Sequence, residues 1–239
     1  MNPSDTPALP PPFPRCERFK FEPISGPPGP LLFLENLLKH PGRILYELEN
    51  GHPKALALWL LALGVGGMAI YGLVVGSLAG GAQLWIAPAK LALGTLLSVL
   101  ICLPSLYIFS CLGGSDARPG AVAGLLAAMV CLSALLLVGF APVAWIFSQS
   151  TDSAAFMGAL HLLFWLIGLF FGLRLLGGMS RLRGESGRAH LRIWAAIFIL
   201  VCLQMTTTLR PLLGRSEHLL PDEKKFFVSH WVDSLSGKR

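Results

Sequence analysis

The chain has 239 residues, of which 54% are hydrophobic and only 13% are charged, and its formal net charge is +6. Ordinary globular domains carry roughly 25% charged residues, so this composition excludes a typical soluble fold. The basic charge fits loops that meet anionic lipid, and it gives no reason to expect nucleic acid as a partner.

The first 30 residues are rich in proline and lack the apolar core of a secretory signal peptide. Such a composition cannot bury enough surface to fold, so residues 1–30 are expected to form an extended, disordered leader. PxxP spacing occurs at Pro7/Pro10 and at Pro11/Pro14, and this spacing is typical of ligands for proline-binding modules. A plain solvated leader is the other interpretation.

Residues 31–54 form the next unit. Leucine and isoleucine recur here at helical spacing, with charged side chains on the other faces. Pro41 divides the unit into two short amphipathic helices. Two arrangements are open: the helices lie in the membrane interface before the first span, or they pack against the cytoplasmic ends of the spans.

Uncharged runs of about 20 residues, the length that an α-helix needs to cross a bilayer, dominate the rest of the chain. The sequence therefore predicts an all-α fold, a polytopic transmembrane helical bundle of about five spans over residues 55–214. The tail, residues 215–239, is amphipathic and is expected to lie against the membrane or under the bundle. The candidate spans are Ala55–Leu78, Leu91–Leu112, Ala121–Phe147, Ala154–Leu173 and Ile193–Leu209.

The distribution of Lys and Arg predicts the orientation of these spans. With five spans and a cytoplasmic N-terminus, 12 of the 19 basic residues face the cytoplasm and 7 face the other side, with Lys90 counted in the first loop. The positive-inside rule favours this orientation. The basic C-terminal tail opposes it, and would be cytoplasmic if the number of spans were even.

Glycines at four-residue spacing predict where helices pack closely, because small residues let two backbones approach. Gly72, Gly76 and Gly80 form such a series at the first span, and Gly168 and Gly172 form one in the fourth. We expect these residues to mediate packing within the chain.

Prolines inside two spans predict kinks. Pro104 lies in the middle of the second span and Pro142 near the end of the third. Each proline frees a backbone carbonyl, which a neighbouring hydroxyl or helix must satisfy. In the short turn before the fourth span, Asp152 or Ser153 is expected to cap the helix.

His161 lies well inside the fourth span. An ionisable residue at membrane depth is by default a functional hypothesis. The alternative is a neutral imidazole that hydrogen-bonds to a neighbouring helix, which we favour because the candidate spans contain no second histidine and no carboxylate.

The end of the fifth span is unusually polar. Gln204, Thr207 and Thr208 lie near one helical face, and Arg210 stands at the interface before Pro211 ends the helix. One interpretation is a site for an anionic head group or substrate, with Arg210 as a bidentate donor. The other is that these groups hydrogen-bond to the kinked second and third spans.

Motifs for catalysis or metal binding are absent from the sequence. It contains no GxSxG, HExxH, GxxxxGK[ST] or GxGxxG with a following acid. The cysteines have no metal-ligand spacing and are interpreted as small apolar packing residues. We therefore expect no catalytic residue, no metal and no cofactor.

An amphipathic stretch, LLKHPGRILYEL, lies shortly before five spans that are joined mostly by short loops. Over roughly Leu31 to Gly214, this layout resembles the Yip family of Rab-interacting five-span membrane proteins and its bacterial relatives. No DLYGP-like signature is found before or within the first span, and the Gly-, Ala- and Arg-rich composition is typical of a bacterial protein. The resemblance implies a bacterial inner-membrane protein and assigns no functional residue.

The functional expectation is a non-enzymatic integral membrane protein that acts as an organising or scaffold subunit. The alternative is a small-solute or lipid transporter that uses the polar end of the fifth span. Expected partners are the lipid bilayer, including anionic lipids, and another membrane protein. The expected location is the bacterial inner membrane, with the N-terminus in the cytoplasm.

Overall fold

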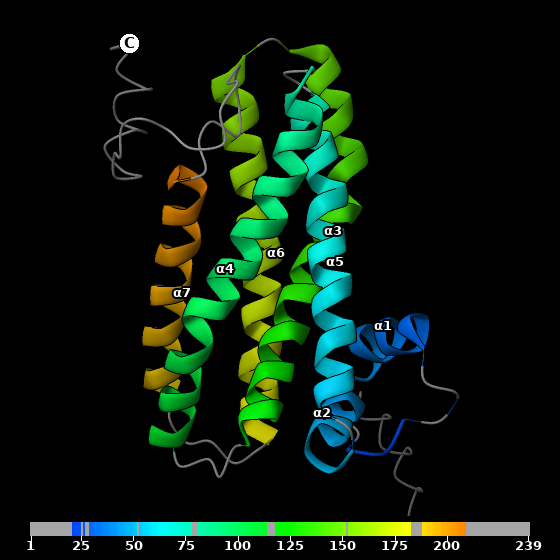
Figure 1. The fold of residues 1–239 in the computed structure, drawn as a ribbon, viewed down its shortest axis with the longest axis vertical. Helices are drawn as coiled ribbons and strands as arrows, with labels where there is room; N and C mark the ends of the chain where they lie inside the picture. Colours follow the sequence, from blue (N-terminus) through cyan, green and yellow to red (C-terminus); the bar gives the residue numbers. More distant parts are fainter. Residues whose placement is uncertain are drawn as a thin grey trace, which may run out of the picture.

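The computed structural model describes residues 21–208 except 25, 27–28, 52, 78–80, 114–117, 152 and 183–187. Within this part of the chain every helix or strand is an α-helix, which confirms the predicted all-α fold (Figure 1). The helices are α1 (Pro30–Lys39), α2 (Pro41–Asn50), α3 (Pro53–Ser77), α4 (Gln83–Leu112), α5 (Pro119–Ser150), α6 (Ala154–Leu182) and α7 (Arg188–Thr208). Residues 1–20 of the leader, Gly80, Arg210 and the tail at 215–239 lie outside the described residues.

Four of these helices, α3 to α6, are long and apolar enough to cross a membrane. The chain is therefore an integral membrane protein. The apolar part of α7, Ala189–Met205, is shorter than the other four. All 21 residues of α7 together extend about 30 Å, so this helix reaches the thickness of a hydrocarbon core only with its polar ends included.

α5 is the central helix of the bundle. α3 and α6 pack along it, α4 lies mainly against α3, and α7 lies mainly against α4 (Figure 1). Small residues on several faces of α5 allow this close enclosure, and they include Gly124, Ala127, Ala128 and Ala134, all of them buried. Most of α5 is covered by protein, whereas α3, α4 and α6 keep much of their apolar surface exposed for lipid.

The second membrane helix begins earlier than the sequence indicated. The segment Gln83–Lys90, which we expected in a short connection, forms the first two turns of α4. The uncharged run stops at Lys90, but the helical packing does not, because Gly72 and Gly76 of α3 lie against this segment. Lys90 is buried rather than exposed in a loop. The basic residues counted on the side opposite the N-terminus therefore fall from seven to six.

The loop expected between the fourth and fifth spans is also mostly helical. α6 continues past Arg174 to Leu182, and α7 begins at Arg188, five residues before the predicted span. Charged residues end a run of apolar composition without ending a helix, because arginine is a good helix former. At the start of α6, Ser153 accepts a hydrogen bond from the Phe156 N–H at 3.3 Å, which is the predicted cap.

The two N-terminal helices pack against one end of the bundle (Figure 1). α2 contacts α3, α5 and α6, and its apolar residues Ile44, Leu45 and Leu48 are fully buried. A Cβ at Gly124 of α5 would collide with Leu48, so this glycine makes the room for α2. The packing of α2 against the ends of α3, α5 and α6 agrees with one of the two arrangements open from the sequence.

Candidate functional site

His161 forms a hydrogen bond with Tyr71 across the bundle. Tyr71 Oη of α3 lies 2.7 Å from His161 Nδ1 of α6, and both side chains are buried. When Tyr71 donates, the neutral imidazole carries its own proton on Nε2. This pairing matches the arrangement in which a neutral histidine is bonded to a neighbouring helix.

The surroundings of this pair are apolar. Tyr71 belongs to a cluster of buried residues from α3, α5 and α6, in which Phe140 and Phe164 stack with ring centroids 4.8 Å apart. His161 Nε2 is buried and finds no hydrogen-bond partner among the described residues. A buried polar atom of this kind needs a hydrogen bond with a water or a ligand group, since leaving that hydrogen bond unmade costs about 1–3 kcal/mol.

Lys90 lies at the same depth as this pair. Tyr71 is six residues from the end of α3, and Lys90 and His161 are each seven residues from the starts of their helices. All three helix ends lie at the end of the bundle opposite α1 and α2 (Figure 1). The three side chains therefore form a buried polar layer about 10 Å below that end. Lys90 was not predicted as a site residue, because it directly precedes an uncharged run and was assigned to a loop.

The polar end of α7 is only partly described. Gln204 is half-buried, Thr207 and Thr208 are the last residues of α7 with side chains outside the described part, and Arg210 lies beyond it. The predicted head-group site therefore lies largely outside the described residues. Gln204 stands ten residues beyond Trp194, about 15 Å along the helix.

Near Pro104 the donors include a hydroxyl and a neighbouring helix, as expected, but the donor on α7 is Trp194 and not Gln204. Trp194 Nε1 of α7 donates to the Cys102 carbonyl at 3.3 Å and lies 3.2 Å from Ser105 Oγ. Ser105 Oγ also donates to Cys102 O at 2.8 Å. Antiparallel packing sets Trp194 opposite this turn of α4, so Gln204 lies too far along α7 to reach it. Pro142 lies inside α5 on an exposed face.

The described packing glycines sit at backbone contacts between helices. A Cβ at Gly72 would lie 2.5 Å from Pro88 Cα, and one at Gly76 would lie 2.6 Å from Gln83 O, both in α4. On the other side of the bundle, a Cβ at Gly168 would lie 3.0 Å from Ser133 O, and Gly172 faces the same residue.

Ser133 joins α5 to α6 at this close approach. Its hydroxyl lies 3.0 Å from the Gly168 carbonyl of α6 and 3.0 Å from the Met129 carbonyl of its own helix. Both acceptors are backbone groups, so the bond depends on the short distance between the two helices. Serine at such a contact is typical of membrane helix packing.

The described residues offer no group of three or more His, Cys, Asp or Glu side chains that could hold a metal ion. Comparisons with protein-family models, curated proteins and solved structures found no match for the chain.

Replacing Tyr71 with phenylalanine is expected to lower the free energy of unfolding by about 1–3 kcal/mol, because His161 Nδ1 is then buried without its partner. Replacing His161 with leucine as well should restore part of this loss, since both polar groups are then gone. Unfolding of the two single variants and the double variant in mixed detergent micelles measures the coupling. Strictly additive effects would contradict a hydrogen bond between the two side chains.

Proposed function

We propose that the protein is a non-enzymatic organising subunit of the membrane, which presents a fixed surface at one end of its bundle to another membrane protein. The observation that carries this proposal is the docking of α2, whose Leu48 lies against Gly124 while Ile44 and Leu45 are fully buried. A pair of helices held in this way has one position relative to the spans. A scaffold needs such a surface, because a partner binds more tightly to a preorganised one.

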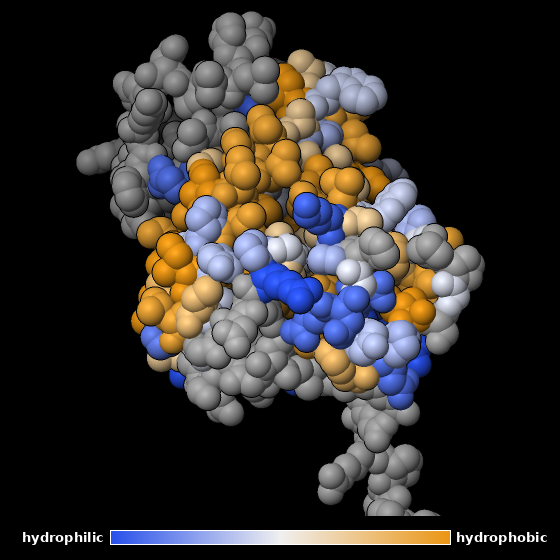
Figure 2. Space-filling view, turned by 60° about the horizontal axis from the view of Figure 1, so that its bottom comes forward, coloured by the Kyte–Doolittle hydropathy of each residue, from blue (hydrophilic) through white to orange (hydrophobic). Residues whose placement is uncertain are grey.

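The surface itself is polar. Figure 2 shows hydrophilic side chains gathered at the end of the molecule that carries α1 and α2, bordered by apolar surface. Glu22 and Arg43 form an ion pair there at 3.3 Å, and Asn50 Nδ2 donates to the Tyr46 carbonyl at 3.2 Å. Charges of both signs on one fixed surface favour a partner of complementary pattern.

We further propose that this end lies in the cytoplasm of a bacterial inner membrane and that the protein is a relative of the Yip family. Twelve basic residues on the α1–α2 side, against six in the loops and tail of the other side, support the orientation. The layout of two short amphipathic helices followed by a bundle supports the family relationship.

The scaffold proposal is tested by isolating the tagged full-length protein from gently solubilised native membranes. The test variant exchanges the ion pair, Glu22→Lys with Arg43→Glu, and the control is Gln149→Lys at the opposite end of the bundle. Wild type and control should retain a partner at fixed stoichiometry, and the exchanged variant should bind it about tenfold more weakly, equivalent to 1.4 kcal/mol. Absence of any stoichiometric partner of the wild type would contradict the proposal.

A small-solute or lipid transporter is the second candidate. The observation that favours it is the common depth of Tyr71, Lys90 and His161, because ionisable groups at membrane depth mark solute and proton pathways in other proteins. Release of solutes from vesicles that contain only this protein would support transport. If the wild type releases solutes, Lys90→Met should abolish this solute release while the variant still inserts and folds.

A further inference from the structure

Exposed tryptophans mark two levels along the bundle. Trp59 lies in the second turn of α3, near α1 and α2, and is 50% exposed. Trp85 and Trp145 lie near the opposite end and are 74% and 52% exposed. Tryptophan concentrates at the two membrane–water boundaries, where its amphipathic ring meets the head groups.

The distance between these levels follows from the helix contacts. Gly64 of α3 faces Cys131 of α5, and Gly67 faces Ala134, which is a constant offset of 67 residues. Trp145 therefore stands one residue beyond the level of Ser77, the last residue of α3, and so 19 residues beyond Trp59. At 1.5 Å per residue this is about 28 Å, close to the thickness of a hydrocarbon core.

α2 lies at the lower of these boundaries. The same offset puts Gly124, the residue that Leu48 contacts, beside residue 57 of α3, two residues before Trp59. α1 follows the same level, because only His40 separates it from α2. Figure 1 shows α1 lying across the bundle axis beside α3, which is the direction of the membrane plane.

α1 has apolar side chains on a buried face and on a second, more exposed face. Phe33 and Leu37 are buried in the core, whereas Leu31 and Leu38, two helical turns apart, are 80% and 51% exposed. Leu34, which is partly buried, lies between the two exposed leucines on the same side of the helix. We call these three leucines the outer face of α1.

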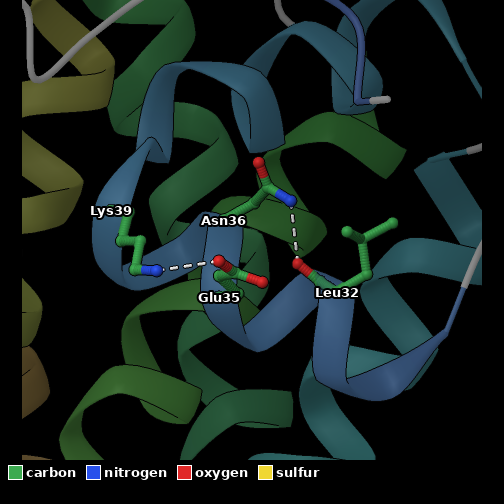
Figure 3. A network of polar contacts seen from close by, with 4 residues as sticks. All are labelled: Leu32, Glu35, Asn36 and Lys39. Atoms are coloured by element: carbon green, nitrogen blue, oxygen red, sulfur yellow. Dashed lines mark hydrogen bonds and ion pairs between the residues drawn. The ribbon is translucent and has the colours of Figure 1, made fainter. Parts of the chain in front are cut away.

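The polar groups of α1 are satisfied within the helix (Figure 3). Lys39 Nζ and Glu35 Oε1 form an ion pair at 2.8 Å, and Asn36 Nδ2 donates to the Leu32 carbonyl at 2.8 Å. The hydrogen bond from Lys39 lowers the pKa of the Glu35 carboxyl, so this carboxylate stays ionised at neutral pH. Internal pairing of this kind lowers the cost of placing the helix among lipid head groups.

We infer that α1 is an in-plane membrane helix whose outer face is seated in lipid, at the boundary between head groups and acyl chains. Lipid is the occupant because α1 lies at the depth of Trp59, where α3 also presents Leu58, which is 68% exposed. Apolar faces of interfacial helices bury about 5–10 Å into this boundary. This inference does not depend on the proposed scaffold function.

Spin-label accessibility tests the inference on the full chain in phosphatidylcholine vesicles. Labels are placed at Leu31→Cys and Leu38→Cys, and at Asn50→Cys, the exposed last residue of α2, as the matched control. The ratio of oxygen to nickel-chelate collisions should be higher at positions 31 and 38 than at 50, because oxygen concentrates in lipid and the chelate in water.

Two results would overturn the inference. A collision ratio at 31 and 38 equal to that at 50 would place the outer face in water. Exclusion of both reagents, with dipolar broadening between labels, would show that a second copy of the chain covers the outer face instead of lipid.

Discussion

Replacing Gly72 with alanine is expected to lower the free energy of unfolding by about 3 kcal/mol, the upper range for overpacking a well-packed site. The added Cβ would meet backbone atoms of α4, at 2.5 Å from Pro88 Cα and 2.9 Å from Pro88 N. Backbone cannot rotate away as a side chain can, so α3 and α4 must separate along their length. Equilibrium unfolding in mixed micelles of a mild detergent and dodecyl sulfate measures the loss.

Gly66 provides the matched control. It lies on the same helix, and a Cβ there would meet nothing within 4 Å. Gly66→Ala should be neutral or stabilise the protein by up to about 1 kcal/mol, because alanine is the better helix former. Equal changes in the free energy of unfolding for Gly72→Ala and Gly66→Ala would contradict a close α3–α4 contact at Gly72.

Replacing Trp194 with alanine is expected to cost about 3–5 kcal/mol, the usual range for truncating a buried aromatic side chain. Trp194 is completely buried, and its ring stacks on Phe198 with centroids 5.2 Å apart. Its indole N–H also bonds to the turn of α4 around Pro104. Because α7 packs mainly against α4, this loss should loosen α7 from the rest of the bundle.

Two variants separate packing from hydrogen bonding at this position. Trp194→Phe keeps a buried ring and should lose only part of the stability, whereas Trp85→Ala removes an exposed tryptophan and should have little effect. Loosening of α7 is measured as faster maleimide labelling of the half-buried Cys202 in Trp194→Ala. Unchanged labelling in that variant would mean that other contacts hold α7 in place.

The sequence predicted the membrane helices because their composition alone identifies them. The predicted ends of these helices were wrong, because an uncharged run stops at the first charged residue whereas a helix can continue through it. Lys90 bounded the start of one predicted span and Arg174 the end of another, yet both lie inside helices. Burial of Lys90 depends on the close approach of α3 and α4, which composition does not encode.

The candidate site was predictable only in its individual residues. His161 was identified from its place in an apolar run, but Tyr71 was not, because the two are 90 residues apart and meet only through helix packing. Likewise a hydroxyl donor near Pro104 was foreseen, but the donor Trp194 on α7 was not. Which residue of α7 stands opposite Pro104 depends on the register between two antiparallel helices.

The docking of α2 has a consequence for the timing of biogenesis. Leu48 is synthesised 76 residues before Gly124, the residue against which it packs. At about 5–20 residues per second, α2 waits roughly 4–15 s for its binding surface to be made. During this interval its apolar residues need temporary cover at the membrane surface. A chain truncated before α5 leaves them uncovered permanently, which exposes incomplete protein to proteases that recognise apolar segments.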